Sequence, residues 1–291
     1  MRKIFLPITI ISFLFIINTI SAQKLYIKPA FGYSFGVHKT FLSVYNLYSE
    51  MSPDTTINSE YLTAKEVSFG NGFNFEVALG THINDNMAIE LIGFLHQSGE
   101  IELESKEELI FYKGYRVSIN DKILIEGFMY GINPNLLYSL DKEKMKYYLK
   151  AGPILGMLSM KETGEMKIFN TIPGYYRSEI SSFKAEYKKQ LNIGISVSCG
   201  AEIRLMNNVY GFVELKYENI RYIPLEREVV EYKFNDKMEL SSLTTSEIFT
   251  EYVDSYASAD NTENSPTKRL KSSYSFSSIG FLCGIRINIL N

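Results

Sequence analysis

The chain has 291 residues, of which 45% are hydrophobic and 22% are charged, with a formal net charge of −3. This composition excludes a mostly disordered chain and a helical multi-span membrane protein. The near-neutral charge also excludes the global electrostatic footprint of a nucleic-acid-binding protein. Aromatic residues are numerous but biased, with 21 Tyr, 19 Phe and no Trp. These features indicate a location and an architecture rather than a reaction.

Residues 1–22 have the pattern of a secretory signal peptide. Arg2 and Lys3 precede an apolar segment, and Ser21-Ala22 supplies a small residue before the expected cleavage site. The apolar segment is shorter than the ~20 residues that a spanning helix needs, which favours cleavage over an uncleaved anchor. We therefore expect a signal peptide over residues 1–22 and one mature domain over residues 23–291.

Apolar and polar residues alternate along eight segments of the mature chain. The clearest is 191–205, where Leu191, Ile193 and Ile195 alternate with polar or small residues. Alternation over such a length predicts a strand, and strands of this length exceed the ~5–6 residues usual in soluble sheets. The other predicted strands are residues 24–37, 68–83, 87–98, 125–140, 145–158, 209–222 and 273–290.

Short and long connections between these segments alternate strictly. The short ones are rich in turn-forming residues and cover residues 84–86, 141–144 and 206–208. The long ones cover residues 38–67, 99–124, 159–190 and 223–272. In an antiparallel meander, this order places all four long loops at one end.

The apolar faces recur on every predicted strand, whereas the opposite faces carry Gly, Ser, Asn and charged residues. A membrane barrel has this inside-out arrangement because lipid surrounds it and its small lumen is polar. Lipid also excludes an open sheet edge, so the first and last strands must pair. The predicted fold is an all-β, eight-stranded, antiparallel up-and-down transmembrane β-barrel. The alternative is a soluble sheet whose apolar faces form a buried core.

With its leader, its alternating segments and its final segment YSFSSIGFLCGIRINIL, the chain resembles small outer-membrane β-barrel proteins of Gram-negative bacteria. The resemblance is to OmpA/OmpX-like or PorT-like barrels without a periplasmic domain. It implies periplasmic short turns, four long extracellular loops, a location in the outer membrane and insertion by the barrel assembly machinery. The ending Ile289-Leu290-Asn291 departs from the terminal aromatic residue common in this family. The resemblance also implies interfacial girdles of aromatic residues, here Tyr26, Tyr33, Tyr138, Tyr147, Tyr148, Tyr217, Tyr222 and Tyr274.

Two long connections carry patterns of their own. Residues 101–105 and 116–120 favour a hairpin that continues the neighbouring strands above the membrane. Residues 241–257 place apolar residues at near-helical spacing, which predicts a short helix over the barrel mouth. A ten-stranded barrel is the alternative if residues 99–124 or 223–272 supply another membrane hairpin.

The predicted inward faces carry charged residues of both signs. The interior of an eight-stranded barrel is just wide enough for side chains to fill, and buried charges need partners. We therefore expect a paired network that plugs the lumen, with a narrow solute path as the alternative. The predicted network comprises Lys28, Glu76, Glu90, Glu202, Arg204, Glu214, Lys216, Glu218 and Arg286.

Two further groups of residues have reactive side chains. His96, Ser98 and Glu100 could supply a nucleophile and a base, but the strand phase turns His96 inward, whereas hydrolysis of membrane lipid needs an outward site. Cys199 and Cys283 fall on lipid-facing positions of strands that another strand separates, so we expect both to be unpaired.

These observations predict no catalytic residue, no metal site and no cofactor. The expected function is non-catalytic and structural or surface-interacting, in adhesion, envelope integrity or secretion-system support. A small-solute porin-like channel is the first alternative, and a lipid-modifying enzyme the second. The expected partners are outer-membrane lipid, the assembly machinery and an extracellular or envelope protein that contacts the long loops. We expect a monomer that binds no nucleic acid.

Overall fold

The computed structural model describes residues 25–43, 55–62, 64–111, 116–142, 144–172, 175–257 and 262–289. The predicted signal peptide lies outside these residues. Within these described residues the fold is all-β apart from two short helical turns, η2 (Leu240–Ser242) and α2 (Thr245–Ile248). None of the helices in the described ranges has the length and hydropathy required to cross a membrane.

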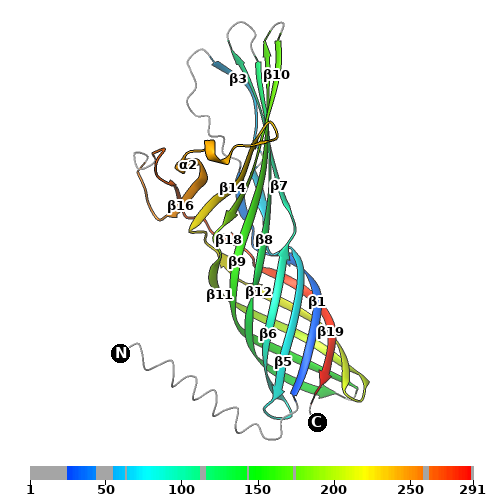
Figure 1. Cartoon of the computed structure of the whole chain (residues 1–291). Helices are drawn as coiled ribbons and strands as arrows, with labels where there is room; N and C mark the ends of the chain where they lie inside the picture. The colour runs from blue at the N-terminus through cyan, green and yellow to red at the C-terminus, as the bar shows by residue number, and fades with distance from the viewer. Residues whose placement is uncertain are drawn as a thin grey trace, which may run out of the picture.

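Eight antiparallel strands close into a barrel (Figure 1). In order around the ring they are β1 (Leu25–Gly36), β5 (Gly72–His82), β6 (Met87–Ser98), β8 (Arg116–Lys142), β9 (Met145–Ile172), β11 (Gln190–Met206), β12 (Val209–Asn219) and β19 (Ser278–Asn288). The ring closes because β19 pairs with β1, with Phe31 opposite Cys283. The predicted ring of eight strands and its closure are thus present.

The sheet continues well above the ring. β8 has 27 residues and β9 has 28, so at ~3.4 Å per residue each is about 90 Å long, far longer than a ~25 Å apolar band requires. We call the part of the sheet above the ring the extension. It consists of residues 116–126 of β8, residues 161–172 of β9, and β3 (Thr55–Leu62), β7 (Ile101–Phe111), β10 (Tyr175–Tyr187), β14 (Glu226–Phe234), β15 (Lys237–Met238), β16 (Phe249–Val253) and β17 (Thr267–Leu270).

Two short ribbons connect the extension to the ring. β2 (Thr40–Ser43) pairs with β4 (Ala64–Val67). β13 (Arg221–Tyr222) pairs with β18 (Tyr274–Ser275). Both ribbons belong to the connections that enter and leave the barrel mouth.

The expectation of four long loops is therefore wrong, and the molecule is more than a plain eight-stranded barrel. The predicted hairpin above the membrane is confirmed, because β7 pairs with β8 from Ile101 opposite Ile125 to Ile110 opposite Arg116. This hairpin adds strands to the extension and leaves the ring at eight, so the ten-stranded alternative is wrong.

The helix predicted over residues 241–257 is confined to the single turn of α2 and the turn of η2. The following sequence Phe249–Val253 forms strand β16. Its aromatic and β-branched residues fit a pleated sheet better than a helix, and pairing with β14 decides the conformation.

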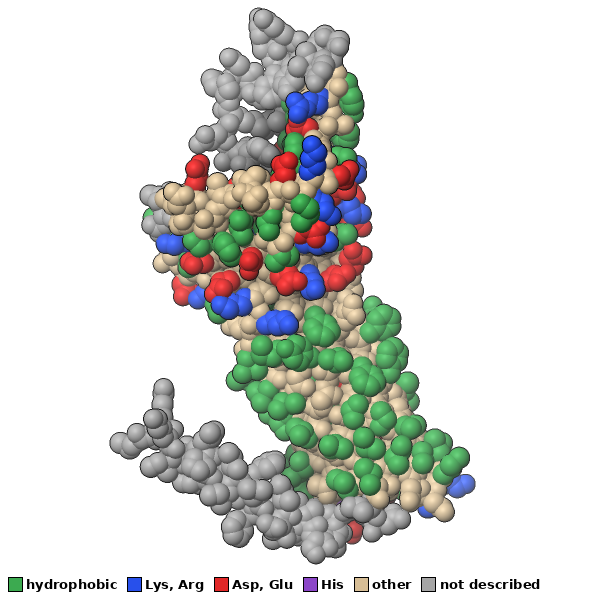
Figure 2. Space-filling model, in the orientation of Figure 1, with side chains coloured by type: hydrophobic (Ala, Val, Ile, Leu, Met, Phe, Trp, Pro, Cys, Tyr) green, Lys and Arg blue, Asp and Glu red, His purple; other side chains and the backbone are tan. Residues whose placement is uncertain are grey.

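The outside of the barrel is apolar and its inside is polar. Figure 2 shows hydrophobic side chains covering the barrel as a belt, and charged side chains gathered over the extension. Ile193 is 73% exposed and Phe281 62% exposed, whereas Glu90 and Lys28 are buried. This distribution is that of an outer-membrane-type barrel, and it is the reverse of what the soluble-sheet alternative requires.

The aromatic girdles are only partly as predicted. Tyr33, Tyr138 and Tyr147 point outward at the ends of the belt. Four of the predicted girdle residues are instead buried: Tyr26, Tyr148, Tyr222 and Tyr274. The pleat explains the error, because Tyr26 lies two residues from Lys28 and therefore shares its inward face.

Candidate functional site

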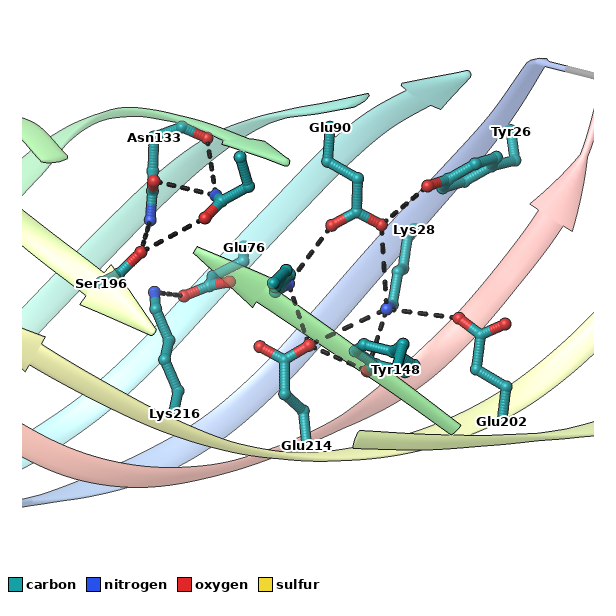
Figure 3. Close-up of polar contacts among 12 residues, drawn as sticks. Tyr26, Lys28, Glu76, Glu90, Asn133, Tyr148, Ser196, Glu202, Glu214 and Lys216 are labelled. Atoms are coloured by element: carbon teal, nitrogen blue, oxygen red, sulfur yellow. Dashed lines mark hydrogen bonds and ion pairs between the residues drawn. The ribbon is translucent and has the colours of Figure 1, made fainter. Parts of the chain in front are cut away.

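A network of buried charges fills the lower lumen (Figure 3). The Nζ atom of Lys150 lies 2.9 Å from Glu214 Oε2 and 3.3 Å from Glu90 Oε2. The hydroxyl of Tyr148 donates to Glu214 Oε2 at 2.9 Å. Lys28 Nζ donates to the same tyrosine oxygen at 3.0 Å, so cations, anions and phenol form one connected cluster.

The cluster extends toward both ends of the lumen. Lys28 Nζ lies 3.3 Å from Glu202 Oε1, whose other oxygen lies 2.7 Å from Arg286 Nη1. On the other side, Lys216 forms ion pairs with Glu76 and Glu218. All of these side chains are buried, and pairing compensates for part of the cost of removing each charge from water.

An uncharged polar cluster lies beside this network. Asn133 Nδ2 donates to Ser196 Oγ at 2.6 Å, and Asn135 Nδ2 donates to Asn133 Oδ1 at 2.8 Å (Figure 3). These residues come from β8 and β11, on either side of β9. The polar filling of the lumen therefore continues along the inner faces of β8 and β11.

The structure places eight of the nine predicted network residues in this lumen. The exception is Arg204, which is exposed near the turn after β11. Its guanidinium donates to the backbone carbonyls of Met206 and Asn207, each at 3.4 Å. The strand phase is correct, but Arg204 lies close enough to the strand end for its long side chain to fold onto the turn.

Sequence reasoning missed three members of the lumen cluster, namely Tyr26, Tyr148 and Lys150. On β9, Lys150 and Tyr148 occupy alternate positions with buried Ile154 and Leu158. The alternate set on β9, with Leu149, Leu155 and Met157, is also apolar, and assigning that set to lipid would have turned Lys150 inward, because alternate strand residues share a face.

An apolar plug lies above the charges, at the barrel mouth. Phe69 stacks on Phe276 with ring centroids 5.4 Å apart and meets Tyr274 edge-on at 5.9 Å. Met129 and Ile220 belong to the same buried cluster. Between the lower charges, the cavity near Lys28 measures about 10 Å³, which is about the space of one water molecule. Charged side chains thus fill the lower part of the described lumen, and apolar side chains fill its mouth.

His96 belongs to the wall of this plug. Its Nδ1 lies 2.8 Å from Asn74 Oδ1 and its Nε2 lies 2.9 Å from the carbonyl oxygen of Phe69. Ser98 Oγ instead donates to the carbonyl of Gly99 and accepts from the backbone N–H of Gly127. Both ring nitrogens are occupied elsewhere, so the structure does not bring His96 and Ser98 together as base and nucleophile.

A second buried polar cluster lies in the extension. Tyr187 OH donates to Glu162 Oε2 at 3.0 Å, and Arg227 Nε donates to the same oxygen at 2.9 Å. Burial, reinforced by the charge of Glu162, raises the pKa of Tyr187 well above its ordinary value. The guanidinium carbon of Arg227 lies 5.3 Å from the ring centroid of Phe183. The arginine is thereby held in one orientation.

The described residues contain no group of three or more His, Cys, Asp or Glu side chains arranged to hold a metal ion. Cys199 and Cys283 are free and exposed, as predicted. A pocket of about 370 Å³ lies outside the lumen, where β9, β10, β14 and β16 meet. It offers far more space for a ligand than the cavity of about 10 Å³ near Lys28.

No family model matches the chain, and no curated protein matches it. Among solved structures, the chain is similar to the outer membrane protease OmpT from Escherichia coli, with 11% identity and a TM-score of 0.28, over 91% of this chain and 97% of that one. It is also similar to OmpT (in-vitro folded), an outer membrane protein of Vibrio cholerae, with 5% identity and a TM-score of 0.15, over the same shares of the two chains.

These comparisons correct one expectation. Because the E. coli structure is a protease, the expectation that this chain is not an enzyme is withdrawn. Similarity at a TM-score of 0.28 assigns no activity to this chain either. The resemblance to OmpA/OmpX-like or PorT-like barrels gains no support, and the coarser description, an all-β, mostly antiparallel outer-membrane-type barrel, rests on the strand pairing.

Proposed function

We propose that this chain is an outer-membrane β-barrel that holds its extension at the cell surface for contact with an extracellular or envelope partner. The observation that carries the proposal is the pairing of β8 with β9. It runs from Arg116 opposite Thr171, high in the extension, to Lys142 opposite Met145 at the far end of the ring. One hairpin therefore belongs to both the membrane belt and the surface structure.

The filled lumen supports this role over that of a porin-like channel. Ion pairs such as Lys150–Glu214 occupy the lower lumen, and Phe69 and Phe276 occupy the mouth. A solute path would require both layers to move. Adhesion, envelope integrity and secretion-system support are all compatible with a closed barrel that presents a folded sheet.

Site-directed labelling tests the orientation. In a Cys199→Ser/Cys283→Ser background, Lys167→Cys places a thiol on the extension and Asn207→Cys places one in the short turn between β11 and β12. A membrane-impermeant maleimide added to intact cells should label position 167, and should label position 207 only after the outer membrane is permeabilised.

A gel assay of the outer-membrane fraction tests the membrane location. A closed membrane barrel should migrate as a compact species in SDS unless it is boiled. Labelling of position 207 but not 167 in intact cells would overturn the orientation. A soluble protein without a heat-dependent shift would overturn the membrane location itself.

A further inference from the structure

The upper part of β10 forms an open edge of the extension (Figure 1). β10 pairs with β9 along almost its whole length, but it pairs with β14 only from Ser181, opposite Phe234, toward the ring. Residues 176–179 therefore have a neighbouring strand on one side and, among the described residues, none on the other.

The upper end of β14 is a tight turn that fills the next position along this edge. Asn235 and Asp236 have φ angles of 48° and 64°, which direct the chain away from β10 and into β15. The N–H of Ile180 donates to Asn235 Oδ1 at 3.0 Å, and the N–H of Asn235 donates to the carbonyl of Ile180 at 2.8 Å. Asn235 thus takes the place of one more strand residue, and the β10–β14 ladder ends there.

Four backbone groups of β10 continue the row above Asn235. Alternate residues of an antiparallel strand direct their N–H and C=O groups to the same side. Because Ile180 faces the β14 side, Ser178 and Tyr176 also direct their N–H and C=O groups to that side. Within the described ranges, no hydrogen bond reaches these four groups. Both residues are exposed, so a strand from outside the chain has access to the row.

The side chains beside the row are suited to an added strand. Tyr176 is 63% exposed and Ile180 is 40% exposed, and their alternate positions place both on the outer face of the sheet. Tyr176 stacks on Phe169 of β9 with ring centroids 6.4 Å apart. Aromatic and β-branched residues pair favourably with apolar residues on a neighbouring strand. Arg177 and Glu179, on the inner face, form an ion pair with each other at 2.8 Å.

The edge at β17 has a different character. β17 carries Lys268 and Arg269, and charged residues of this kind protect an edge strand from pairing. Residues 176–180, Tyr-Arg-Ser-Glu-Ile, include neither lysine nor proline. The open part of β10 therefore lacks the usual devices that prevent strand addition.

A second copy of this chain fits the row poorly. With Ser178 of each copy opposite the other, the second copy's Tyr176 would lie opposite Ile180, in the position that Asn235 already occupies. With the symmetry centre moved to Arg177, two arginines would lie directly opposite each other, which destabilises the pairing. The row therefore favours a segment of a different protein.

We propose that the open edge of β10 binds an extended segment of another protein, which adds to the sheet as one antiparallel strand in line with β14. Its backbone forms hydrogen bonds with Ser178 and Tyr176, and apolar residues at every second position pack on Tyr176 and Ile180. This inference rests on the proposed function, and it names the form in which the partner is recognised.

The test places p-benzoylphenylalanine, a photo-crosslinking amino acid, at position 176 of the full chain in cells of the source organism. Irradiation should give a crosslinked product, and mass spectrometry should locate the crosslink in one segment with apolar residues at alternate positions. The same amino acid at Thr163, exposed on the outer face of the central strand β9, should give none.

Ser178→Pro supplies the backbone test because it removes an N–H that faces the open edge and leaves the bonds to β9 in place. It should reduce the crosslinked product about tenfold, since the partner loses one main-chain hydrogen bond and meets the proline ring. The matched control Ser178→Thr keeps the N–H and should retain the product. In the isolated crosslinked complex, the amides of residues 176–179 should exchange hydrogen at least tenfold more slowly than in the free protein.

A product that Ser178→Pro leaves unchanged, in protein with a normal gel shift, would overturn strand addition. Unchanged hydrogen exchange in the complex would overturn it without recourse to a variant, and so would a crosslink to a second copy of this chain. A product at position 163 but not at 176 would overturn the inference and leave the proposed function standing. The absence of a product at both positions would overturn the surface partner as well.

Discussion

Lys150 and Glu214 meet across the lumen, with 2.9 Å between Nζ and Oε2, although β11 separates their strands in the ring. The pair therefore links strands that share no backbone hydrogen bonds. Glu90 lies 3.3 Å from the same nitrogen, so one lysine holds two carboxylates from different parts of the wall. Removing the lysine leaves Lys28, at 3.9 Å from Glu90 and 3.8 Å from Glu214, as the cation that both carboxylates must share.

Lys150→Met should therefore be strongly destabilising. Breaking a buried ion pair from one side costs roughly 3–5 kcal/mol, because the remaining charge is uncompensated. The temperature of the gel shift and the urea midpoint of refolded protein should both fall. Lys142→Met, at an exposed position, should change stability by no more than ~0.5 kcal/mol. Equal effects of the two substitutions would show that the lumen network contributes no stability.

Gly80→Ala should destabilise the barrel through a direct overlap. A Cβ atom at Gly80 would collide with the ring of Tyr26, which is buried in the lumen. Overpacking of this kind costs about 1–3 kcal/mol. At Gly93 the nearest atom to an added Cβ is 3.9 Å away, so Gly93→Ala is the control. The thermal shift of each variant measures the difference, and equal shifts would contradict the packing argument.

Reconstituted protein should show no steady conductance in a planar bilayer. The lower charges and the upper Phe69–Phe276 stack close the lumen in separate layers. A variant that loosens only the lower layer, Lys150→Ala/Glu90→Ala, should also stay silent because the apolar layer remains. Regular porin-sized current steps from the unmodified protein would refute the closed lumen.

The extension should lose stability at alkaline pH. The ordinary pKa of tyrosine is 10.0, and burial raises the pKa of Tyr187 well above it. The stabilising contribution is complete below pH 10, and it is lost as the pH rises toward the folded-state pKa, because the unfolded chain releases its proton first. Absorbance at alkaline pH should show Tyr187 ionising only as the extension unfolds.

Tyr187→Phe should remove that late ionisation, whereas Tyr176→Phe, at a residue 63% exposed, should remove an ordinary one. If Tyr187 ionised together with the exposed tyrosines while the extension stayed folded, the buried hydrogen bond to Glu162 would be ruled out.

The two cysteines should react according to the solvent they face. Cys199 and Cys283 are exposed on the outside of the ring, and each lies opposite a residue of β12, so β12 separates them. A lipid-soluble maleimide should modify both in vesicles, and a charged maleimide should modify neither. Identical gel mobility with and without reductant should accompany this result. Rapid labelling by the charged reagent would place these positions in water.

The ring could be predicted from the sequence because lipid imposes strict alternation on its strands. Leu191 to Leu205 keeps every second residue apolar, and only the strand period fits. The extension is not under that constraint. Its inner face mixes Leu103 and Ile119 with buried Ser105 and Glu107, so the apolar alternation breaks and the sequence reads as loop. Pairing with β8 and β9, a long-range property, supplies the missing order.

The charged lumen is likewise predictable where one face of a strand is clearly polar, as for Glu214 and Lys216. Lys150 is harder to assign because β9 carries apolar residues on both faces, with Leu155 outward and Ile154 inward. At Arg204 the alternation assigns the correct face of the strand but not the position of the guanidinium group. A long side chain near a strand end can still turn toward solvent. The extension pocket was not predictable, because its lining residues Lys161, Glu186 and Arg227 come from separate strands brought together only by pairing.

The pairing of β8 with β9 across the junction between extension and belt also determines how the molecule responds to force. Along the described register from Gly127 to Ile132, the two strands stay paired as they pass from the extension into the belt, with no hinge between them. A force applied to the extension would load these hydrogen bonds side by side in shear, rather than opening them one at a time. The extension would thus move together with the barrel as one rigid body. A force on the extension would be transmitted directly to the barrel wall.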